Sequence, residues 1–211
     1  MLHADTLALL IVALPLAGFL INGTLGLFLP SYRQAKTWIG TLSTLLVFVP
    51  FLAGVMLFLQ TEAQGAAHIT TLFTWIDTGA LQVDIAYRID PLSVLMILVV
   101  TGVGSLIHLY SMGYMSHDEG YWKFFAYLNL FIFAMLNLVM GDNLLLLFLG
   151  WEGVGLCSYL LIGFWYQDMA KSDAAKKAFI YNRVGDFAFL VAVFLIFGQV
   201  GSLAFDDVLG S

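Results

Sequence analysis

Glu152 is the residue in this sequence with the clearest potential for chemistry, because it lies near the centre of an apolar run from Asn143 to Tyr166. An ionised carboxylate in hydrocarbon costs several kcal/mol unless a partner, water or a bound proton compensates it. The favoured interpretation is a proton-carrying site; the alternative is a glutamate paired permanently with a basic residue to fix helix packing. Since no lysine lies at mid-depth in the apolar runs, we expect a protonated Glu152 or a partner from outside the chain.

Arg183 and Asp186 form a second group on another apolar run. Residues three apart are neighbours on one helical face, so the two side chains are placed to form an ion pair within the membrane. A static pair would neutralise both charges. A pair that opens would act as an electrostatic gate for a nearby carboxylate, and the spacing alone leaves both interpretations open.

His108 and Lys177 are weaker candidates for the same proton path. His108 lies late in its apolar run, and an imidazole ordinarily titrates near neutral pH, which suits a relay, although a hydrogen-bonded packing histidine is the favoured interpretation. Lys177 is expected at the basic end of its helix, where lysines usually extend to the headgroups and where one could also receive protons from solvent.

The sequence predicts no cofactor and no metal site in this chain. Cys157 is the single cysteine, so it cannot supply the four ligands of an iron–sulfur cluster, and we expect it to be a small buried apolar residue. His117 falls on the opposite helical face from His108, which disfavours a haem held by both. No basic footprint for nucleic acid is present.

Six apolar runs must position these residues. The 211 residues are 61% hydrophobic and only 10% charged, which excludes an ordinary soluble domain. Each run is long enough to cross about 30 Å of hydrocarbon at about 1.5 Å per residue. The sequence therefore predicts an all-α integral membrane protein with six transmembrane helices, at Thr6–Leu29, Thr37–Gln60, Pro91–Met112, Trp122–Met140, Asn143–Tyr166 and Lys177–Gln199. The first run lacks a basic leader and a cleavage pattern, so we expect it to be a permanent helix.

The connection between the second and third helices, residues 61–90, has a different composition. Its β-branched and aromatic residues, interrupted at Asp77–Ala80, predict a β-hairpin on the outer membrane surface. The hairpin is either a clasp against a neighbouring subunit or a covering loop. It separates the first two helices (1–60) from the third helix with its cytoplasmic loop (91–121) and from the last three helices (122–211).

Basic residues flank the runs unequally and predict the orientation, because they are retained on the cytoplasmic or matrix side. Arg88 alone belongs to the outer side. The N-terminus is therefore expected on the periplasmic or intermembrane side. The basic residues assigned to the inner side are Arg33, Lys36, Lys123, Lys171, Lys176 and Lys177.

Small and amide residues within the runs predict how the helices contact one another. The asparagines are expected to form interhelical hydrogen bonds, and the glycines to permit close helix contact or to leave room for water near Glu152. The asparagines are Asn22, Asn129 and Asn137, and the glycines are Gly150, Gly153, Gly155 and Gly163.

Four stretches of the sequence resemble the family of the largest antiporter-like membrane subunit of respiratory complex I, the proton-pumping NADH:quinone oxidoreductase (chain 5 or subunit L type). They are Arg88–Ser93, Ile107–Ser111, Gly150–Phe164 and Lys177–Asp186. The resemblance implies two inverted five-helix repeats, the first beginning with the fourth helix, in 122–211. It also implies that Glu152 is the key glutamate, and that Arg183, Asp186 and Lys177 match conserved family positions.

The resemblance further implies a proton-translocating subunit of that enzyme, without a redox centre of its own. FMN, iron–sulfur clusters and quinone would then belong to partner subunits, with a neighbouring antiporter-like subunit and the lipid bilayer as contacts, in a bacterial or mitochondrial inner membrane. The chain would match the first third of a family member, and the family's central lysine, on a broken seventh helix, would lie beyond Ser211. Alternatives are a subunit of the related sodium/proton antiporters and a structural membrane scaffold.

Overall fold

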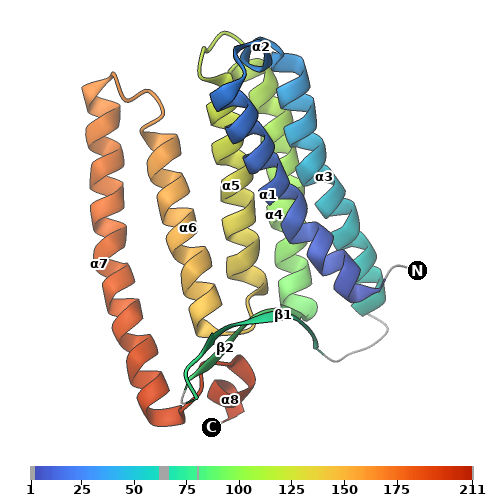
Figure 1. Cartoon of the computed structure of the whole chain (residues 1–211), viewed down its shortest axis with the longest axis vertical. Helices are drawn as coiled ribbons and strands as arrows, with labels where there is room; N and C mark the ends of the chain where they lie inside the picture. The colour runs from blue at the N-terminus through green and yellow to red at the C-terminus, as the bar shows by residue number, and fades with distance from the viewer. Residues whose placement is uncertain (1–2, 62–66, 80, 211) are drawn as a thin grey trace.

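The computed structural model describes residues 3–61, 67–79 and 81–210. Its elements are all helices except for one β-hairpin (Figure 1). Six helices are long and apolar enough to cross a membrane, which confirms the predicted all-α membrane architecture. The elements are α1 (Ala4–Phe28), α2 (Pro30–Gln34), α3 (Lys36–Thr61), β1 (His68–Asp77), β2 (Gln82–Ile89), α4 (Pro91–Tyr114), α5 (Tyr121–Met140), α6 (Leu144–Ile162), α7 (Met169–Val200) and α8 (Phe205–Gly210).

Most helix boundaries differ from the prediction by one or two residues, and two differ by four or more because capping groups, not apolarity, define them. Helix α7 begins at Met169 rather than at Lys177, since the Asp168 carboxylate accepts a hydrogen bond from the Ala170 N–H and caps a polar first turn. Helix α6 ends at Ile162 rather than at Tyr166, with Gly163 at its C-cap. The short helices α2 and α8 were not predicted.

Helices α1, α3, α4 and α5 form one bundle, α6 packs against α5, and α7 packs against the far side of α6 (Figure 1). Glycines allow the closest approaches in the bundle: a Cβ at Gly104 would lie 2.6 Å from the Ile132 side chain. Helix α6 lies closest to α5 at Gly150, where a Cβ would lie 2.7 Å from the Cα of Leu138. The predicted role of glycine in close contact is thus confirmed at Gly150, but not at Gly155, where nothing lies within 4 Å.

The prediction of interhelical asparagine bonds is correct for one of three residues. Asn22 donates to the Ser43 hydroxyl of α3 at 2.7 Å and accepts from the Tyr32 hydroxyl at 2.7 Å. Asn129 and Asn137 instead donate to carbonyl oxygens of their own helix, because the carbonyl one turn earlier is within reach of the amide. The oxygen of Asn137 accepts from the Tyr87 hydroxyl of β2, so that bond joins a helix to a strand.

The predicted hairpin is present, with β1 and β2 antiparallel from His68↔Ile89 to Asp77↔Gln82. The hairpin is linked by a backbone hydrogen bond to the reversal between α5 and α6. The Asp142 N–H donates to the Ala86 carbonyl at 3.0 Å, and the Leu144 N–H donates to the Leu203 carbonyl at 3.0 Å. The hairpin therefore holds the α5–α6 turn and the chain after α7 together in one small platform at the hairpin end of the helices.

Arg88 is the charged centre of this platform. Its guanidinium lies 3.1 Å from the Asp142 carboxylate and 3.7 Å from Asp90, and it also pairs with Asp206 of α8. Burial raises the pKa of the Asp142 carboxyl; Arg88 opposes this shift and the negative charge of Asp206 adds to it.

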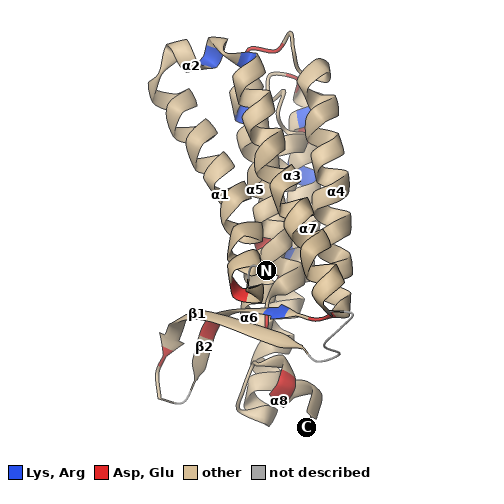
Figure 2. Cartoon of the chain, turned by 90° about the vertical axis from the view of Figure 1, so that its right-hand side faces the viewer, with Lys and Arg blue, Asp and Glu red and all other residues tan. Residues whose placement is uncertain are grey.

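The remaining basic side chains gather mainly toward the other end of the helices, as Figure 2 shows. Arg33, Lys36 and Lys123 lie beyond or near helix ends there, whereas Arg88 lies with the hairpin. The charge asymmetry thus maps onto the two ends of the molecule. The side of the membrane that each end faces stays a prediction.

Replacing Gly150 tests the backbone contact between α5 and α6. We expect Gly150→Ala in the full-length protein to lower stability by about 1–3 kcal/mol, because the methyl group would overlap the Leu138 backbone. Thermal melting of the solubilised protein measures this. Gly155→Ala is the matched control, and an equal loss in both variants would contradict the close contact at Gly150.

The Arg88 cluster predicts two opposite shifts of the Asp142 pKa. Asp206→Asn should lower it by removing a negative charge, and Arg88→Gln should raise it further by removing the cation. Because the folded-state pKa lies above the ordinary 3.8, the contribution of Asp142 to stability falls as pH rises from 3.8 through the folded-state pKa. Infrared titration of ¹³C-labelled aspartate carboxyls measures the midpoint, and an unchanged midpoint in both variants would contradict this arrangement.

Candidate functional site

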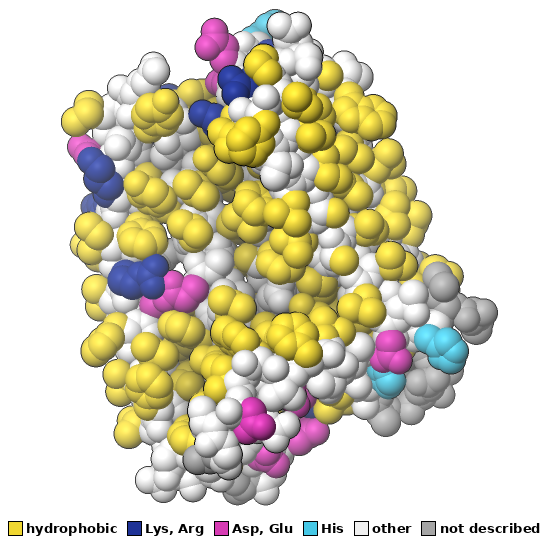
Figure 3. Space-filling view, viewed as in Figure 1, with side chains coloured by type: hydrophobic (Ala, Val, Ile, Leu, Met, Phe, Trp, Pro, Cys, Tyr) yellow, Lys and Arg dark blue, Asp and Glu magenta, His cyan; other side chains and the backbone are white. Residues whose placement is uncertain are grey.

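The Glu152 carboxylate of α6 and the Arg183 guanidinium of α7 form an ion pair between the two helices. Both residues lie in the middle part of their helices. Figure 3 shows acidic and basic side chains together at mid-height among hydrophobic ones over α6 and α7. The expectation that Glu152 lacks a partner in this chain is therefore wrong. Its partner is an arginine on the next helix, not a lysine.

Asp186 completes the site. Its carboxylate lies 3.9 Å from the Nε of Arg183, and its other oxygen accepts a hydrogen bond from the Trp151 indole N–H at 2.8 Å. The Asp186 side chain is 7% exposed, against 21% for Glu152 and 49% for Arg183. The predicted proximity of Arg183 and Asp186 is confirmed, but the closer partner of the arginine is Glu152.

The three charged groups do not balance. Two carboxylates and one guanidinium carry one net negative charge when all are ionised, and an uncompensated charge at membrane depth is costly. One bound proton, or one further cation, makes the group neutral. The site is therefore chemically suited to bind and release a single positive charge.

Aromatic rings flank the charged group on two sides. Arg183 lies 4.8 Å from the centroid of Phe179, which packs at 5.4 Å against Tyr159. On the side of Trp151, its ring lies 6.1 Å from that of Phe189. A low-dielectric wall of this kind strengthens every electrostatic interaction within it.

The structure does not bring Lys177 or His108 to this site. Lys177 is exposed on α7, six residues before Arg183, with its ammonium 6.0 Å from the Tyr181 ring. His108 is buried on α4, in the bundle on the other side of α5. The prediction for Cys157 is confirmed, since it is fully buried.

Trp151 is the site residue that the sequence analysis missed. An indole N–H inside an apolar run needs an acceptor, so a tryptophan directly before Glu152 was a usable indication. Its partner could not be named in advance, because Asp186 lies on another helix and the pairing depends on how α6 and α7 are rotated.

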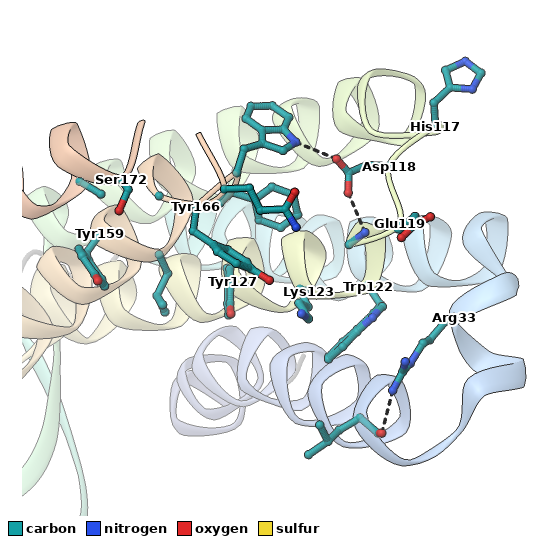
Figure 4. Close-up of a pocket in the computed structure, with 18 residues that line it drawn as sticks. Arg33, His117, Asp118, Glu119, Trp122, Lys123, Tyr127, Tyr159, Tyr166 and Ser172 are labelled. Carbon is teal, nitrogen blue, oxygen red and sulfur yellow. Dashed lines mark hydrogen bonds between the residues drawn. The ribbon is translucent and has the colours of Figure 1, made fainter. Parts of the chain in front are cut away.

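A groove of about 980 Å³ opens at the basic end of the molecule, away from the Glu152 site (Figure 4). Two of its polar side chains are hydrogen-bonded: the Trp165 indole donates to Asp118 at 2.8 Å, and Arg33 donates to the Gly26 carbonyl at 2.7 Å. Aromatic rings with charged neighbours are typical of a helix end at the headgroup level. The groove contains none of the residues predicted for the proton path.

Two family models match the chain. The model described as NADH-ubiquinone oxidoreductase (complex I), chain 5 N-terminus, matches residues 75–125, and the model described as NADH:quinone oxidoreductase/Mrp antiporter, TM, matches residues 141–210. The second match contains Glu152, Arg183 and Asp186.

Curated relatives match almost the whole chain. It is 47% identical over 202 residues to NADH-quinone oxidoreductase subunit L of Mycobacterium tuberculosis, which covers 94% of this chain and 31% of the relative. It is 42% identical over 206 residues to the chloroplastic NAD(P)H-quinone oxidoreductase subunit 5 of Mesostigma viride, covering 95% of this chain and 31% of the relative. The chain thus spans about a third of the length of these relatives.

Solved structures share the fold. A chain of the membrane-bound sulfane sulfur reductase, an archaeal respiratory membrane complex, superposes with a TM-score of 0.81 at 22% identity, covering 97% of this chain and 39% of that chain. A chain of the Mrp complex from Dietzia sp. gives 0.79 at 22% identity, covering 98% and 21%.

Removing the indole N–H tests the support of Asp186. We expect Trp151→Phe to destabilise the full-length protein by about 1–3 kcal/mol, because a buried carboxylate oxygen loses its donor. Trp165→Phe removes a matched indole–carboxylate bond at an exposed position and should cost less. The apparent melting temperatures of the two variants decide this, and equal values would contradict a special role for the Trp151 bond.

Proposed function

The chain belongs to the chain 5 or subunit L family of antiporter-like NADH:quinone oxidoreductase subunits, and we propose that it supplies a proton-exchanging glutamate to a proton-translocating complex of that kind. The observation that carries this proposal is one arginine shared by two carboxylates at mid-membrane. The group holds one negative charge too many, and a proton is the smallest ligand that corrects it.

Glu152 and Arg183 would act as a switch between two neutral arrangements. While Arg183 is paired with Glu152, the Glu152 carboxylate remains ionised. The compensating proton is then bound at Asp186 or close to it. When Arg183 moves toward Asp186, which already lies 3.9 Å away, Glu152 is left without a cation and takes up a proton. Each movement of the guanidinium therefore exchanges a proton at Glu152.

The force that moves the arginine would come from outside this chain. The relatives are about three times as long, and we infer that a lysine from their remaining length approaches Glu152 and competes with Arg183. Redox chemistry on FMN, iron–sulfur clusters and quinone would belong to partner subunits. The N-terminus and the hairpin would face the periplasm or intermembrane space, as the basic residues at the opposite end favour.

The hairpin would contact a neighbouring antiporter-like membrane subunit. Its β1 strand exposes large apolar side chains, with Phe73 58% and Trp75 44% exposed. Exposed aromatic residues of this size are characteristic of interface cores. This interpretation is the clasp that the sequence analysis left as one of two alternatives.

Replacing Glu152 tests the proposal directly. In the full-length protein within its complex, Glu152→Gln should abolish proton pumping while NADH oxidation by the complex persists, because glutamine cannot exchange a proton. Protons translocated per NADH in sealed vesicles is the measurement. Glu119→Gln is the matched control, since Glu119 is exposed in the α4–α5 loop and lies outside the site.

Three outcomes would point elsewhere. A normal proton yield in Glu152→Gln would refute the role of this carboxylate. Sodium-dependent transport in vesicles without NADH would favour a sodium/proton antiporter subunit. Impaired assembly with normal pumping by the complexes that do assemble, in both Glu152→Gln and Asp186→Asn, would favour a structural scaffold.

A further inference from the structure

A second buried polar group lies in the α1–α3–α4–α5 bundle, on the far side of α5 from Glu152. His108 of α4 is 1% exposed and Asn129 of α5 is 0% exposed. Each has one polar atom without a hydrogen-bond partner among the described residues, namely the Nε2 of His108 and the Oδ1 of Asn129. A buried unpaired polar atom costs about 1–3 kcal/mol, so a pair of them in one bundle needs an explanation.

The bond at the other ring nitrogen fixes the chemistry of His108. Its Nδ1 lies 2.8 Å from the Gly104 carbonyl oxygen, which can only accept, so Nδ1 carries the proton of the neutral ring. The Nε2 atom is therefore an acceptor with a free lone pair. A buried histidine held in this tautomer is a base without a bound donor.

Asn129 presents a second acceptor. Its amide nitrogen donates to the Phe125 carbonyl at 2.8 Å, which leaves the Oδ1 turned toward α1 at Gly18. A Cβ at Gly18 would lie 2.7 Å from the amide carbon of Asn129, so glycine is what makes room for this side chain. Both unpaired atoms thus lack the same thing, a hydrogen-bond donor.

Contacts between the helices place these two acceptors at similar heights along the helix bundle. The His108 ring lies 6.0 Å from that of Phe125, which is one turn from Asn129. On α1, Asn22 is one turn from Gly18. The Asn22–Ser43 bond then brings α3 to the same level.

Four nearby side-chain donors are already used. The Ser43 hydroxyl donates to the Ile39 carbonyl at 2.7 Å, and the Asn22 amide donates to Ser43. On α4, the Thr101 and Ser105 hydroxyls donate to carbonyl oxygens of their own helix, at 2.6 and 2.8 Å. The titratable groups next to this layer are the phenols of Tyr32, bonded to Asn22, and of Tyr121, whose ring centroid lies 4.8 Å from that of Phe125.

We propose that this layer is an internal water site, in which water donates hydrogen bonds to His108 Nε2 and to Asn129 Oδ1. In this site His108 acts as a proton acceptor separate from Glu152. Water fits because it is the small donor that the two acceptors lack. A proton arriving through this water from the aqueous phase forms the Nε2–H bond. The ring then donates to the water instead of accepting from it.

The inference does not rest on the pumping role of Glu152, and its test does not measure pumping. Deuterium exchange at the C2–H of histidine proceeds through the protonated ring and needs water-derived hydroxide, so it reports both protonation and water access. Mass spectrometry of the full-length protein in its complex, held in D₂O in lipid nanodiscs, measures this exchange for each histidine. The exposed His117 serves as the internal reference.

We expect His108 to take up deuterium measurably, though more slowly than His117. Asn129→Leu removes one of the two acceptors and should slow the exchange of His108 about fivefold. Asn182→Leu, at an exposed position on α7, is the matched control and should leave it unchanged.

Absence of deuterium at His108 while His117 exchanges fully would overturn the proposal, because the bundle would then be dry at this level. That comparison uses the unmodified protein and stands even if Asn129→Leu fails to assemble. Equal slowing by Asn129→Leu and Asn182→Leu would also overturn the assignment of the site.

Discussion

One cation between two carboxylates in hydrocarbon is the constraint on which the rest of this structure depends. Arg183 cannot neutralise Glu152 and Asp186 at the same time, so the group keeps one net negative charge unless a proton or another cation binds. Because of this charge imbalance, the depth and rotation of α6 and α7 determine which carboxylate the arginine neutralises. A small displacement of the guanidinium between its two partners changes which carboxylate needs a proton.

The two helices that carry the group are held differently. Helix α6 lies with its backbone against α5 at Gly150, and its first turn is fixed by the Asn143 side chain, which accepts from the Leu146 N–H. Helix α7 meets α6 at mid-height through Arg183, the indole of Trp151 and the tilted ring pair of Trp151 and Phe189. In the proposed switch, Glu152 would be on the helix anchored to α5, and Arg183 would be on the helix that shifts.

Helix α5 separates two polar sites of different character. Toward α6 and α7 lies the charged group, in which the Asp186 and Glu152 carboxylates each have a hydrogen-bond donor. Toward α1, α3 and α4 lies a neutral layer with two unpaired acceptors, at His108 and Asn129. The platform around Arg88 joins the α5–α6 reversal to the hairpin at one end of α5, the helix between the two sites.

The sequence by itself determined the spans, the hairpin and the residues most suited to proton chemistry, because apolar length, β-branched content and a lone carboxylate are local properties. It also placed Arg183 beside Asp186, since that proximity needs only the helical repeat. Only the tertiary structure decided that Arg183 pairs with Glu152, that Trp151 holds Asp186 and that Asn129 keeps an unpaired oxygen. These outcomes depend on the rotation and relative depth of packed helices, and partners 31 residues apart in the chain cannot be matched from spacing alone.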